Sequence, residues 1–250
     1  MDEKSIRFSE ARIAALGSTV AAEGIGRMSE KSVHKIFKLY IEPNEQFHEV
    51  KYLGSIADIK NDRGIYEIQT RALYKLIPKL EKFLPTSRVT VVIPVIVEKT
   101  IRTLNKKTGE ISAPRKSPLH ESVYTAFAEL YDLRRVAAHK NLSFKLLLVK
   151  ADEYKYLGGP RGERKIDKIP TALVEEYDFS SFADYLRFIP ESVGERFTAK
   201  ELCSAVGCHH SLSSALAGFL RSVGAISIVA REGRSNVYTL NKSEEYTVGR

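Results

Sequence analysis

Apolar residues recur with a helical period near the start of the chain. Residues 9–22 are rich in alanine, and Gly24 and Gly26 interrupt them. A second helix is expected after Ser29, because the apolar side chains that follow lie three or four positions apart: Val33, Ile36, Phe37 and Tyr40. Two helices are therefore predicted before residue 43.

Short strand-like runs replace this pattern from residue 47 onward. Three runs, at residues 47–53, 55–60 and 65–70, are separated by Leu53-Gly54 and by Asn-Asp-Arg-Gly at 61–64. Glycine, asparagine and aspartate between such runs are typical of hairpin turns. The sequence therefore predicts a small antiparallel sheet of three strands.

Helical and strand-like segments alternate in the middle of the chain. An amphipathic helix is expected over 71–83 with a kink at Pro78, and Val89–Val97 is typical of a buried strand. A hairpin, a helix, a buried strand and an exposed loop are predicted next, over residues 100–112, 121–136, 143–149 and 152–170. This mixture indicates an α/β fold with a mixed sheet flanked by helices.

The last part of the chain predicts a second domain. Thr198-Ala-Lys-Glu201 has the pattern of a capping box at the start of a helix, and Gly207 turns the chain. A further helix and two strands follow, at residues 211–223, 226–230 and 236–240. This order is that of a winged helix-turn-helix, so we predict domains over residues 1–170 and 171–250.

The two turns of the small sheet determine which residues face one another. If residues 53–54 form a two-residue turn, counting back in pairs places Glu49 opposite Asp58. If residues 62–63 form the second turn, the same count places Asp58 opposite Glu67. Three carboxylates would then lie side by side on one face of the sheet.

Such a row of carboxylates has two interpretations. Opposed like charges repel, because their Cβ atoms lie about 4.5–5.5 Å apart. The row can belong to a solvated polar face, or it can bind a cation such as Mg²⁺, which prefers oxygen ligands. Apolar neighbours favour the metal site: Ile56, Ile59, Ile65 and Ile68. A bulge at Gly64 would shift the register and remove the row.

Two pieces of this sheet resemble the core motif of the restriction-endonuclease-like, or PD-(D/E)XK, nucleases. Ile-Ala-Asp58-Ile is followed by Ile-Tyr-Glu67-Ile-Gln69-Thr, which is similar to that family's Asp on one strand and Glu-x-Lys on the next. The resemblance implies that Asp58 and Glu67 are metal ligands. It also implies cleavage of phosphodiester bonds with Mg²⁺ or Mn²⁺ as cofactor.

Two members of this catalytic set are less well defined. Glu49 is the expected third metal ligand, although Glu42 or Glu45 from the preceding helix could replace it. Gln69 stands where the family usually has lysine, and glutamine can orient a water but adds no charge. A lysine from elsewhere could supply that charge, and the candidates are Lys51, Lys60, Lys75 and Lys116.

The whole chain also resembles an uncharacterised bacterial family with a restriction-endonuclease-like core and a C-terminal winged helix. Besides the two strand motifs and the tail, the matching pieces are Ser-Glu-Lys-Ser-Val-His34, His48-Glu49-Val and Arg115-Lys116-Ser-Pro. This resemblance implies a fold more than an activity.

The distribution of charge favours a partner that carries phosphate. The net charge is +8, of which +10 falls in residues 1–170 and −2 in residues 171–250. Arg115 and Lys116, on a basic segment after a predicted hairpin, are expected to contact phosphate. The alternative is a solvated loop.

The predicted winged helix offers a second set of nucleic-acid contacts. Its last helix would present Ser213 and Ser214 to base edges, and its wing would present Arg231 and Arg234 to phosphate. Residues 198–240 carry a net charge of only +2. Because weak charge means weak non-specific DNA affinity, dimerisation or protein binding by this domain remains an alternative.

Several features of the sequence predict the state of the cysteines, the cellular location and the partners of the protein. Cys203 and Cys208 do not suggest a disulfide scaffold, and their spacing does not match a closed zinc site. No apolar run follows the N-terminal residues, and none is long enough to cross a bilayer. A cytoplasmic protein without a membrane partner is expected, and a homodimer is left open.

The function predicted from these patterns is a metal-dependent endonuclease that acts on DNA and is targeted or regulated by its winged helix. The alternative is a DNA-binding regulator whose nuclease-like core has lost catalysis. The clustered acids favour the enzyme, whereas Gln69 favours the regulator. A protein-interaction module without nucleic acid is a third possibility, against which the basic charge of residues 1–170 argues.

Overall fold

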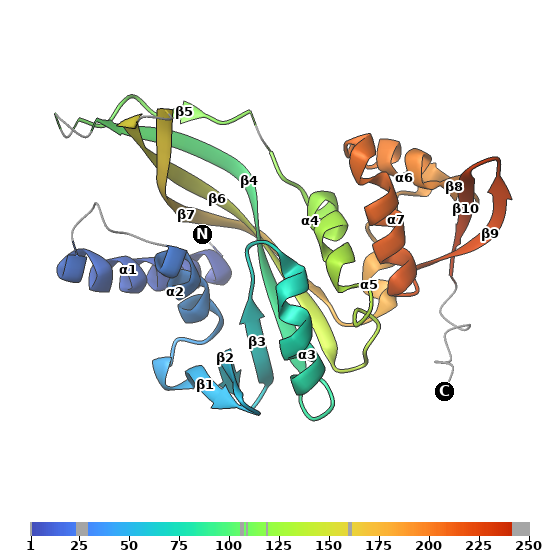
Figure 1. Cartoon of the computed structure of the whole chain (residues 1–250), viewed down its shortest axis with the longest axis horizontal. Coiled ribbons are helices and arrows are strands. Elements are labelled where there is room, and N and C mark those ends of the chain that lie inside the picture. Colours follow the sequence, from blue (N-terminus) through green and yellow to red (C-terminus); the bar gives the residue numbers. More distant parts are fainter. Residues whose placement is uncertain are drawn as a thin grey trace. The chain divides into compact units, whose positions relative to one another are not determined.

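Two helices begin the structure and pack against each other. The computed structural model describes residues 2–23, 30–105, 108, 110–118, 120–159 and 162–241. Helix α1 (Glu3–Glu23) contacts helix α2 (Glu30–Ile41) (Figure 1). The rings of Phe8 and Tyr40 meet edge to face with centroids 5.6 Å apart. Both helices were predicted and are confirmed. The residues expected to separate them, Gly24, Gly26 and Ser29, lie outside the described residues.

A seven-stranded sheet follows these helices. Its order is β1-β2-β3-β4-β6-β7, and β5 pairs with β4. The strands are β1 (His48–Tyr52), β2 (Ser55–Asn61), β3 (Gly64–Ile68), β4 (Val89–Asn105), β5 (Arg115–Lys116), β6 (Leu142–Gly159) and β7 (Gly162–Phe179). The neighbours β3 and β4 are joined by a crossover that contains η2 (Leu73–Leu76) and α3 (Ile77–Phe83). The fold is therefore mixed α/β with a sheet flanked by helices, as the sequence predicts.

The chain divides into two compact units, and each unit collects separate segments of the sequence. Unit 1 contains Met1–Ile68, Pro94–Ser122 and Leu147–Glu176. Unit 2 contains Gln69–Ile93, Val123–Leu146 and Tyr177–Arg250. The domain boundary at residue 170 stays a prediction, and the sections below treat the two units separately.

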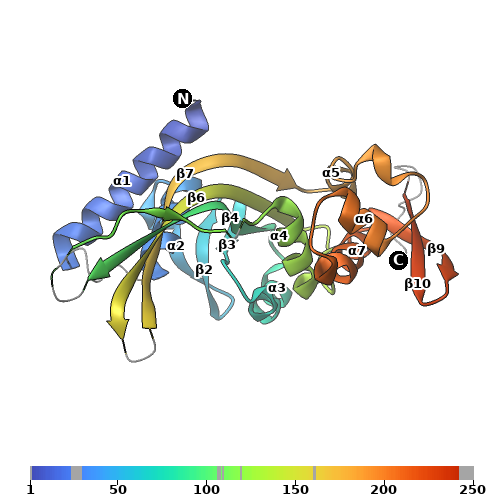
Figure 2. The same cartoon turned by 90° about the horizontal axis from the view of Figure 1, so that it is seen from above.

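The expected exposed loop at residues 152–170 is wrong. Residues 152–159 and 162–170 belong to β6 and β7, two long strands that lie side by side (Figure 2). The segment is rich in Gly, Lys and Arg, a composition that is typical of loops. The burial of the side chains that the structure describes at its start nevertheless alternates, as in a strand. Ala151 and Glu153 are buried, whereas Lys150 is exposed. One polar face is usual for a strand of this kind.

Two predicted helices are shorter than expected. The helix after β3 begins only at Ile77, because Ala72 adopts a left-handed φ of 54° and a 3-10 turn intervenes. Pro78 therefore lies in the first turn of α3, where a missing N–H costs nothing, and produces no kink. The helix expected at 121–136 is α4 (Val123–Leu130) followed by η3 (Tyr131–Leu133).

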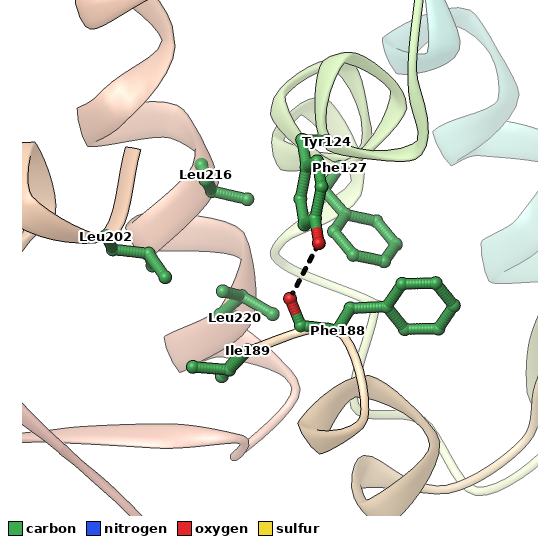
Figure 3. Close-up of a pocket in the computed structure, with 7 residues that line it drawn as sticks. All are labelled: Tyr124, Phe127, Phe188, Ile189, Leu202, Leu216 and Leu220. Atoms are coloured by element: carbon green, nitrogen blue, oxygen red, sulfur yellow. Dashed lines mark hydrogen bonds between the residues drawn. The ribbon is translucent and has the colours of Figure 1, made fainter. Parts of the chain in front are cut away.

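Unit 2 has an aromatic core around Phe127 of α4. The ring of Phe127 lies 5.4 Å from Phe179 and 6.0 Å from Phe219, which it stacks against. Beside it, Tyr124 donates a hydrogen bond of 3.0 Å to the carbonyl of Phe188 (Figure 3). A small apolar hollow there is lined by residues of α4, α6 (Ala199–Ala205) and α7 (Ser213–Ser222) and of the segment after α5 (Phe182–Leu186): Tyr124, Phe127, Phe188, Ile189, Leu202, Leu216 and Leu220. The tail and α4 thus share one hydrophobic core.

The tail contains the predicted order of helix, turn, helix and hairpin. After η4 (Glu191–Val193) come β8 (Phe197–Thr198), α6 (Ala199–Ala205) and η5 (His210–Leu212). Helix α7 (Ser213–Ser222) and the strands β9 (Ile226–Glu232) and β10 (Ser235–Leu240) follow. The capping box is confirmed, since the Thr198 hydroxyl accepts from the Glu201 N–H and the Glu201 carboxylate accepts from the Thr198 N–H. Strands β8, β10 and β9 form a separate sheet in that order.

A disulfide joins Cys203 of α6 to Cys208 in the turn before α7. The sequence had given no reason to expect this bond. The backbone supports the same turn, because the N–H of Cys208 donates to the carbonyl of Cys203 at 2.9 Å and Gly207 adopts a φ of 68°. None of the helices in the described ranges combines the length and apolar character needed to cross a membrane.

Candidate metal and nucleic-acid sites

The register of the small sheet in unit 1 is the one counted from its turns. Between β1 and β2 the partners are His48↔Ile59, Val50↔Ala57, Lys51↔Ile56 and Tyr52↔Ser55. Between β2 and β3 they are Ile59↔Tyr66, Lys60↔Ile65 and Asn61↔Gly64. The first turn contains Leu53 with a φ of 45° and Gly54 with a φ of 70°, the left-handed pair that a tight hairpin requires. The predicted register is confirmed, and Gly64 does not shift it.

Asp58 lies where this register brings it toward Glu67. Continuing one pair past Ile59↔Tyr66 sets Asp58 opposite Glu67, so both residues belong to the same face of the sheet. The carboxylate of Asp58 also has a local role, because its Oδ2 accepts a hydrogen bond of 2.8 Å from the N–H of Ile68. A carboxylate has further acceptor positions, so this bond leaves Asp58 with capacity for a second ligand.

Glu67 is the more unusual of the two acids, because it is buried. Only 1% of its surface is exposed, and its strand neighbours Ile65 and Ile68 are buried to the same degree. Taking a carboxylate out of water is costly unless nearby groups compensate for its charge. A buried acid beside a second acid is therefore a feature that the hydrophobic pattern of the strand does not require.

Glu49 departs from the expected row. Its backbone has a left-handed φ of 52°, although the burial of side chains along β1 still alternates. Its side chain is 71% exposed, and its Oε1 lies 2.8 Å from the Nζ of Lys38 on α2. Among the residues that the structure describes, no three His, Cys, Asp or Glu side chains are grouped so that they could hold a metal ion. The structure thus does not gather Glu49, Asp58 and Glu67 into one such group, and their metal roles stay predictions.

The other acids considered for the third position are held by neighbours. Glu42 accepts hydrogen bonds from Asn61 at 2.8 Å and from the N–H of Asn44 at 3.1 Å, and Arg63 lies 3.3 Å away. Burial opposes its ionisation, but these bonds outweigh burial and hold the pKa of Glu42 below its usual range. Glu45 lies 3.8 Å from Lys35. Both carboxylates therefore have structural partners.

Gln69 begins unit 2 and is held by its own loop. Its N–H donates to the carbonyl of Val92 at 3.0 Å, and its side-chain amide donates to the carbonyl of Arg71. Its amide oxygen and second N–H remain as further hydrogen-bonding positions.

The candidate lysines are spread over several environments. The ammonium of Lys60 lies over the ring of Tyr52, and that of Lys116 lies 3.7 Å from Glu98. Lys51 and Lys75 are exposed, on β1 and η2. Lys38 of α2, whose side chain is only 12% exposed, reaches the predicted acid Glu49. No pattern in the sequence indicates this pair, because the helix and the strand meet there only in the folded chain.

The predicted phosphate contacts of unit 1 are exposed on β5. Arg115 and Lys116 pair with Ile101 and Thr100 of β4. The ammonium groups of Lys116 and Lys150 flank the carboxylate of Glu98, at 3.7 and 3.6 Å. Part of the positive charge at this position is therefore neutralised.

The predicted contacts in the tail differ in their accessibility. Ser213 is 7% exposed, and its hydroxyl donates to the carbonyl of His210 at 2.8 Å, so it is engaged inside the tail. Ser214 is exposed, as are Arg231 and Arg234 in the β9–β10 hairpin. The wing of the predicted winged helix thus offers its two arginines, while α7 offers only a narrow polar strip.

Comparisons with known proteins give relatives without assigned chemistry. A family model described as "Domain of unknown function (DUF8091)" matches residues 31–180. An uncharacterized protein of Treponema pallidum (strain Nichols) is 28% identical over 223 residues, which cover 86% of each chain. No solved structure matches the chain. The matched family region includes Asp58, Glu67 and Gln69.

Proposed function

Because the chain belongs to the family described as a domain of unknown function (DUF8091), we propose its function from its own residues: it is a metal-dependent nuclease. The observation that carries this proposal is the pair formed by Asp58 and Glu67. Extending the register of β2 and β3 by one pair places these acids opposite each other, and Glu67 is 1% exposed. Repulsion and desolvation both oppose such a pair, and a bound cation relieves both.

The order of the elements supports this proposal. Helix α2, the antiparallel strands β1, β2 and β3, the crossover through α3, and strand β4 follow one another along the chain, with the strands adjacent in that order. The restriction-endonuclease-like core that the sequence resembles has a similar order. In that core one acid lies on one strand and the other on the next, as Asp58 on β2 and Glu67 on β3 do here.

The donor set suits a hard divalent cation. Mg²⁺ is commonly held by one or two carboxylates, with waters and substrate phosphates completing its coordination. Asp58 and Glu67 provide two such carboxylates, and Glu49 is not needed to reach that number. When bound, the ion would place positive charge at the scissile phosphate and lower the pKa of an attacking water.

The protein's own residues would orient the reactants around this pair. Asp58 is fixed by its hydrogen bond to the Ile68 N–H, which restricts the direction of its remaining oxygen. Gln69 belongs to unit 2, where its side-chain amide donates to the carbonyl of Arg71. The glutamine adds no charge, so the rate depends more strongly on the acids than in a lysine-containing site.

A second function is favoured by the local role of Asp58 and by the tail. If Asp58 serves only to hold the Ile68 N–H, the core is a scaffold and the protein is a DNA-binding regulator. The tail supports this alternative, because β8, α6, α7 and the β9–β10 hairpin have the order of a winged helix and expose Arg231 and Arg234. In the nuclease proposal the same tail targets the enzyme.

The test separates the charge of Asp58 from its hydrogen bond. Asp58→Asn keeps an oxygen that can accept from the Ile68 N–H but removes the charge, whereas Asp58→Ala removes both. Asp62→Asn is the matched control, because Asp62 is exposed in the next turn. Cleavage of plasmid, single-stranded DNA and RNA is measured with Mg²⁺ and with Mn²⁺.

We expect the wild type and Asp62→Asn to cleave equally, and Asp58→Asn and Glu67→Gln to lose roughly a hundredfold or more. Asp58→Asn should melt near the wild-type temperature, whereas Asp58→Ala should melt lower because it leaves a backbone donor unsatisfied. Full activity in Asp58→Asn would refute the nuclease site. DNA binding by the wild type without cleavage of any substrate would establish the regulator instead.

A further inference from the structure

The positive charge of unit 2 is concentrated outside its tail. Residues 69–93 and 123–146 together contain nine Lys or Arg and three Asp or Glu, a net charge of +6 over 49 residues. Residues 177–250 contain eight basic and eight acidic residues and are neutral. The tail, although it has the order of a DNA-binding fold, is therefore the less attractive part of this unit for a polyanion.

Seven exposed side chains form what we call the basic surface: Arg71, Lys75, Lys82, Arg88, Arg134, Arg135 and Lys140. They come from two segments that pack together. The N–H of Val89 donates to the carbonyl of Asn141 at 2.8 Å, and the Asn141 amide donates to the carbonyl of Leu84 at 2.8 Å. Farther along, η2 contacts η3. The charges are thus held on one region of the unit by backbone and side-chain bonds.

Much of this charge is not neutralised. Within the described parts of the chain, no Asp or Glu lies in ion-pair range of Arg88, Arg135 or Lys140. This differs from Lys116 and Lys150 of unit 1, which share the carboxylate of Glu98. Unpaired cations at the surface gain most from phosphate, because each contact releases a counterion from the nucleic acid.

An exposed aromatic ring lies within the same segments. Tyr74 of η2 is 56% exposed and stands between Arg71 and Lys75 in the chain. A tyrosine ring left in water gains by stacking on the face of an unpaired base. Beside η2, the guanidinium of Arg134 lies 4.4 Å above the ring of Tyr131 in η3. Cations interleaved with an exposed ring suit single-stranded nucleic acid better than an acidic protein.

We propose that the basic surface binds the phosphate backbone of single-stranded nucleic acid, with Tyr74 stacking on a base. The inference rests on the proposed function in one respect, since it names the substrate class of that nuclease. It assigns the principal nucleic-acid contacts to η2, α3 and the segment after η3. The wing arginines then make a minor contribution.

The test measures binding in the absence of cleavage. Fluorescence anisotropy of a labelled single-stranded oligonucleotide and of its duplex is recorded in EDTA over a range of salt concentrations. The variant is Arg88→Ala/Arg135→Ala/Lys140→Ala. Its matched control, Arg196→Ala/Lys200→Ala/Arg221→Ala, removes the same charge from exposed positions of the same unit. Tyr74→Ala is compared with Tyr74→Phe, which keeps the ring.

We expect the first triple variant to weaken single-strand binding at least roughly tenfold at low salt and to reduce its salt slope by about 2, at about 0.7 per lost contact. The control triple should change binding less than about threefold. Tyr74→Ala should weaken single-strand binding by roughly tenfold, and Tyr74→Phe should not. If the first triple variant unfolds, Arg88→Glu alone is used for the same comparison.

Two results would overturn the inference: equal losses in the two triple variants, or duplex binding at least as tight as single-strand binding. An absence of any binding at low salt would overturn it as well. Binding with the expected pattern but no cleavage with Mg²⁺ or Mn²⁺ would refute the nuclease and leave the surface established, so the two proposals fail separately.

Discussion

One buried phenol, Tyr40, connects three elements of unit 1. Its hydroxyl donates to Glu176 of β7 at 2.8 Å, and Glu176 is also 2.6 Å from Lys4 of α1. The guanidinium of Arg7 lies 4.5 Å above the ring. Burial, together with the hydrogen bond to Glu176, raises the pKa of Tyr40 to about 12. Ionisation of this one side chain is therefore coupled to the docking of α1 and α2 on the strand.

This coupling predicts a loss of stability at alkaline pH. The pKa of tyrosine is about 10 in the unfolded chain, so the contribution of Tyr40 is complete below pH 10 and is lost as the pH rises toward 12. Between pH 9 and pH 11 the free energy of unfolding of the wild type should fall by about 1 kcal/mol more than that of Tyr40→Phe. Urea denaturation at the two pH values measures this difference.

Tyr124 and Tyr185 also have pKa values raised by burial. Both residues are present in the wild type and in Tyr40→Phe, so their contributions cancel in the comparison. Parallel pH dependence of the two proteins would contradict the assignment to Tyr40.

At the scale of elements, helix α7 approaches η3 closely at Gly218. A Cβ added to Gly218 would lie 2.9 Å from Cδ2 and 3.2 Å from Cζ of Tyr131, which is closer than packed carbon atoms tolerate. Gly218 therefore has a packing role, and its backbone conformation does not require glycine.

We predict that Gly218→Ala destabilises the protein by about 1–3 kcal/mol, because the ring of Tyr131 or the helix has to move. Gly17→Ala is the matched control. Gly17 lies in α1 with nothing within 4 Å of an added Cβ, so alanine should stabilise the helix by about 0.5–1 kcal/mol. Thermal unfolding of the two variants gives both values. Equal stability of Gly218→Ala and wild type would show that the ring of Tyr131 can move aside without a loss of stability.

The sequence was informative where local chemistry determines an element. The hairpin register followed from Leu53-Gly54 and from the second turn, and the capping box followed from Thr198 and Glu201. The sequence was uninformative where groups from separate elements determine a conformation or a contact. The left-handed φ of Glu49 is uncommon for a glutamate, and its contact with Lys38 comes from another element. Polar composition also concealed β6 and β7, although these strands are neighbours both in the chain and in the sheet.

At the scale of the whole molecule, the two units are interleaved along the chain. Strand β4 begins in unit 2 and continues into unit 1 at Pro94, and β6 and β7 also cross between the units. The tail shares its core with α4, because Phe219 stacks on Phe127 and Leu216 and Leu220 line the same apolar hollow.

We therefore predict that a fragment of residues 171–250 does not fold like the intact tail. Without α4 it would expose Leu216, Phe219 and Leu220, which are at most 2% exposed in the full chain. The fragment should lack cooperative thermal unfolding and should have poorly dispersed amide resonances. A sharp melting transition and a dispersed spectrum would instead support the domain boundary predicted at residue 170.

The interleaving also determines when the protein can fold during its synthesis. Unit 1 begins with the first residues of the chain, but its last segment ends only at Glu176. At typical rates of translation of about 5–20 residues per second, roughly 5–20 s separate the emergence of residue 68 from that of residue 176. Throughout this interval the nascent chain carries the acid-bearing strands β2 and β3 without the rest of their unit. Newly made β1–β3 sheet therefore exposes apolar side chains, such as Ile59 and Ile65, that the complete fold buries.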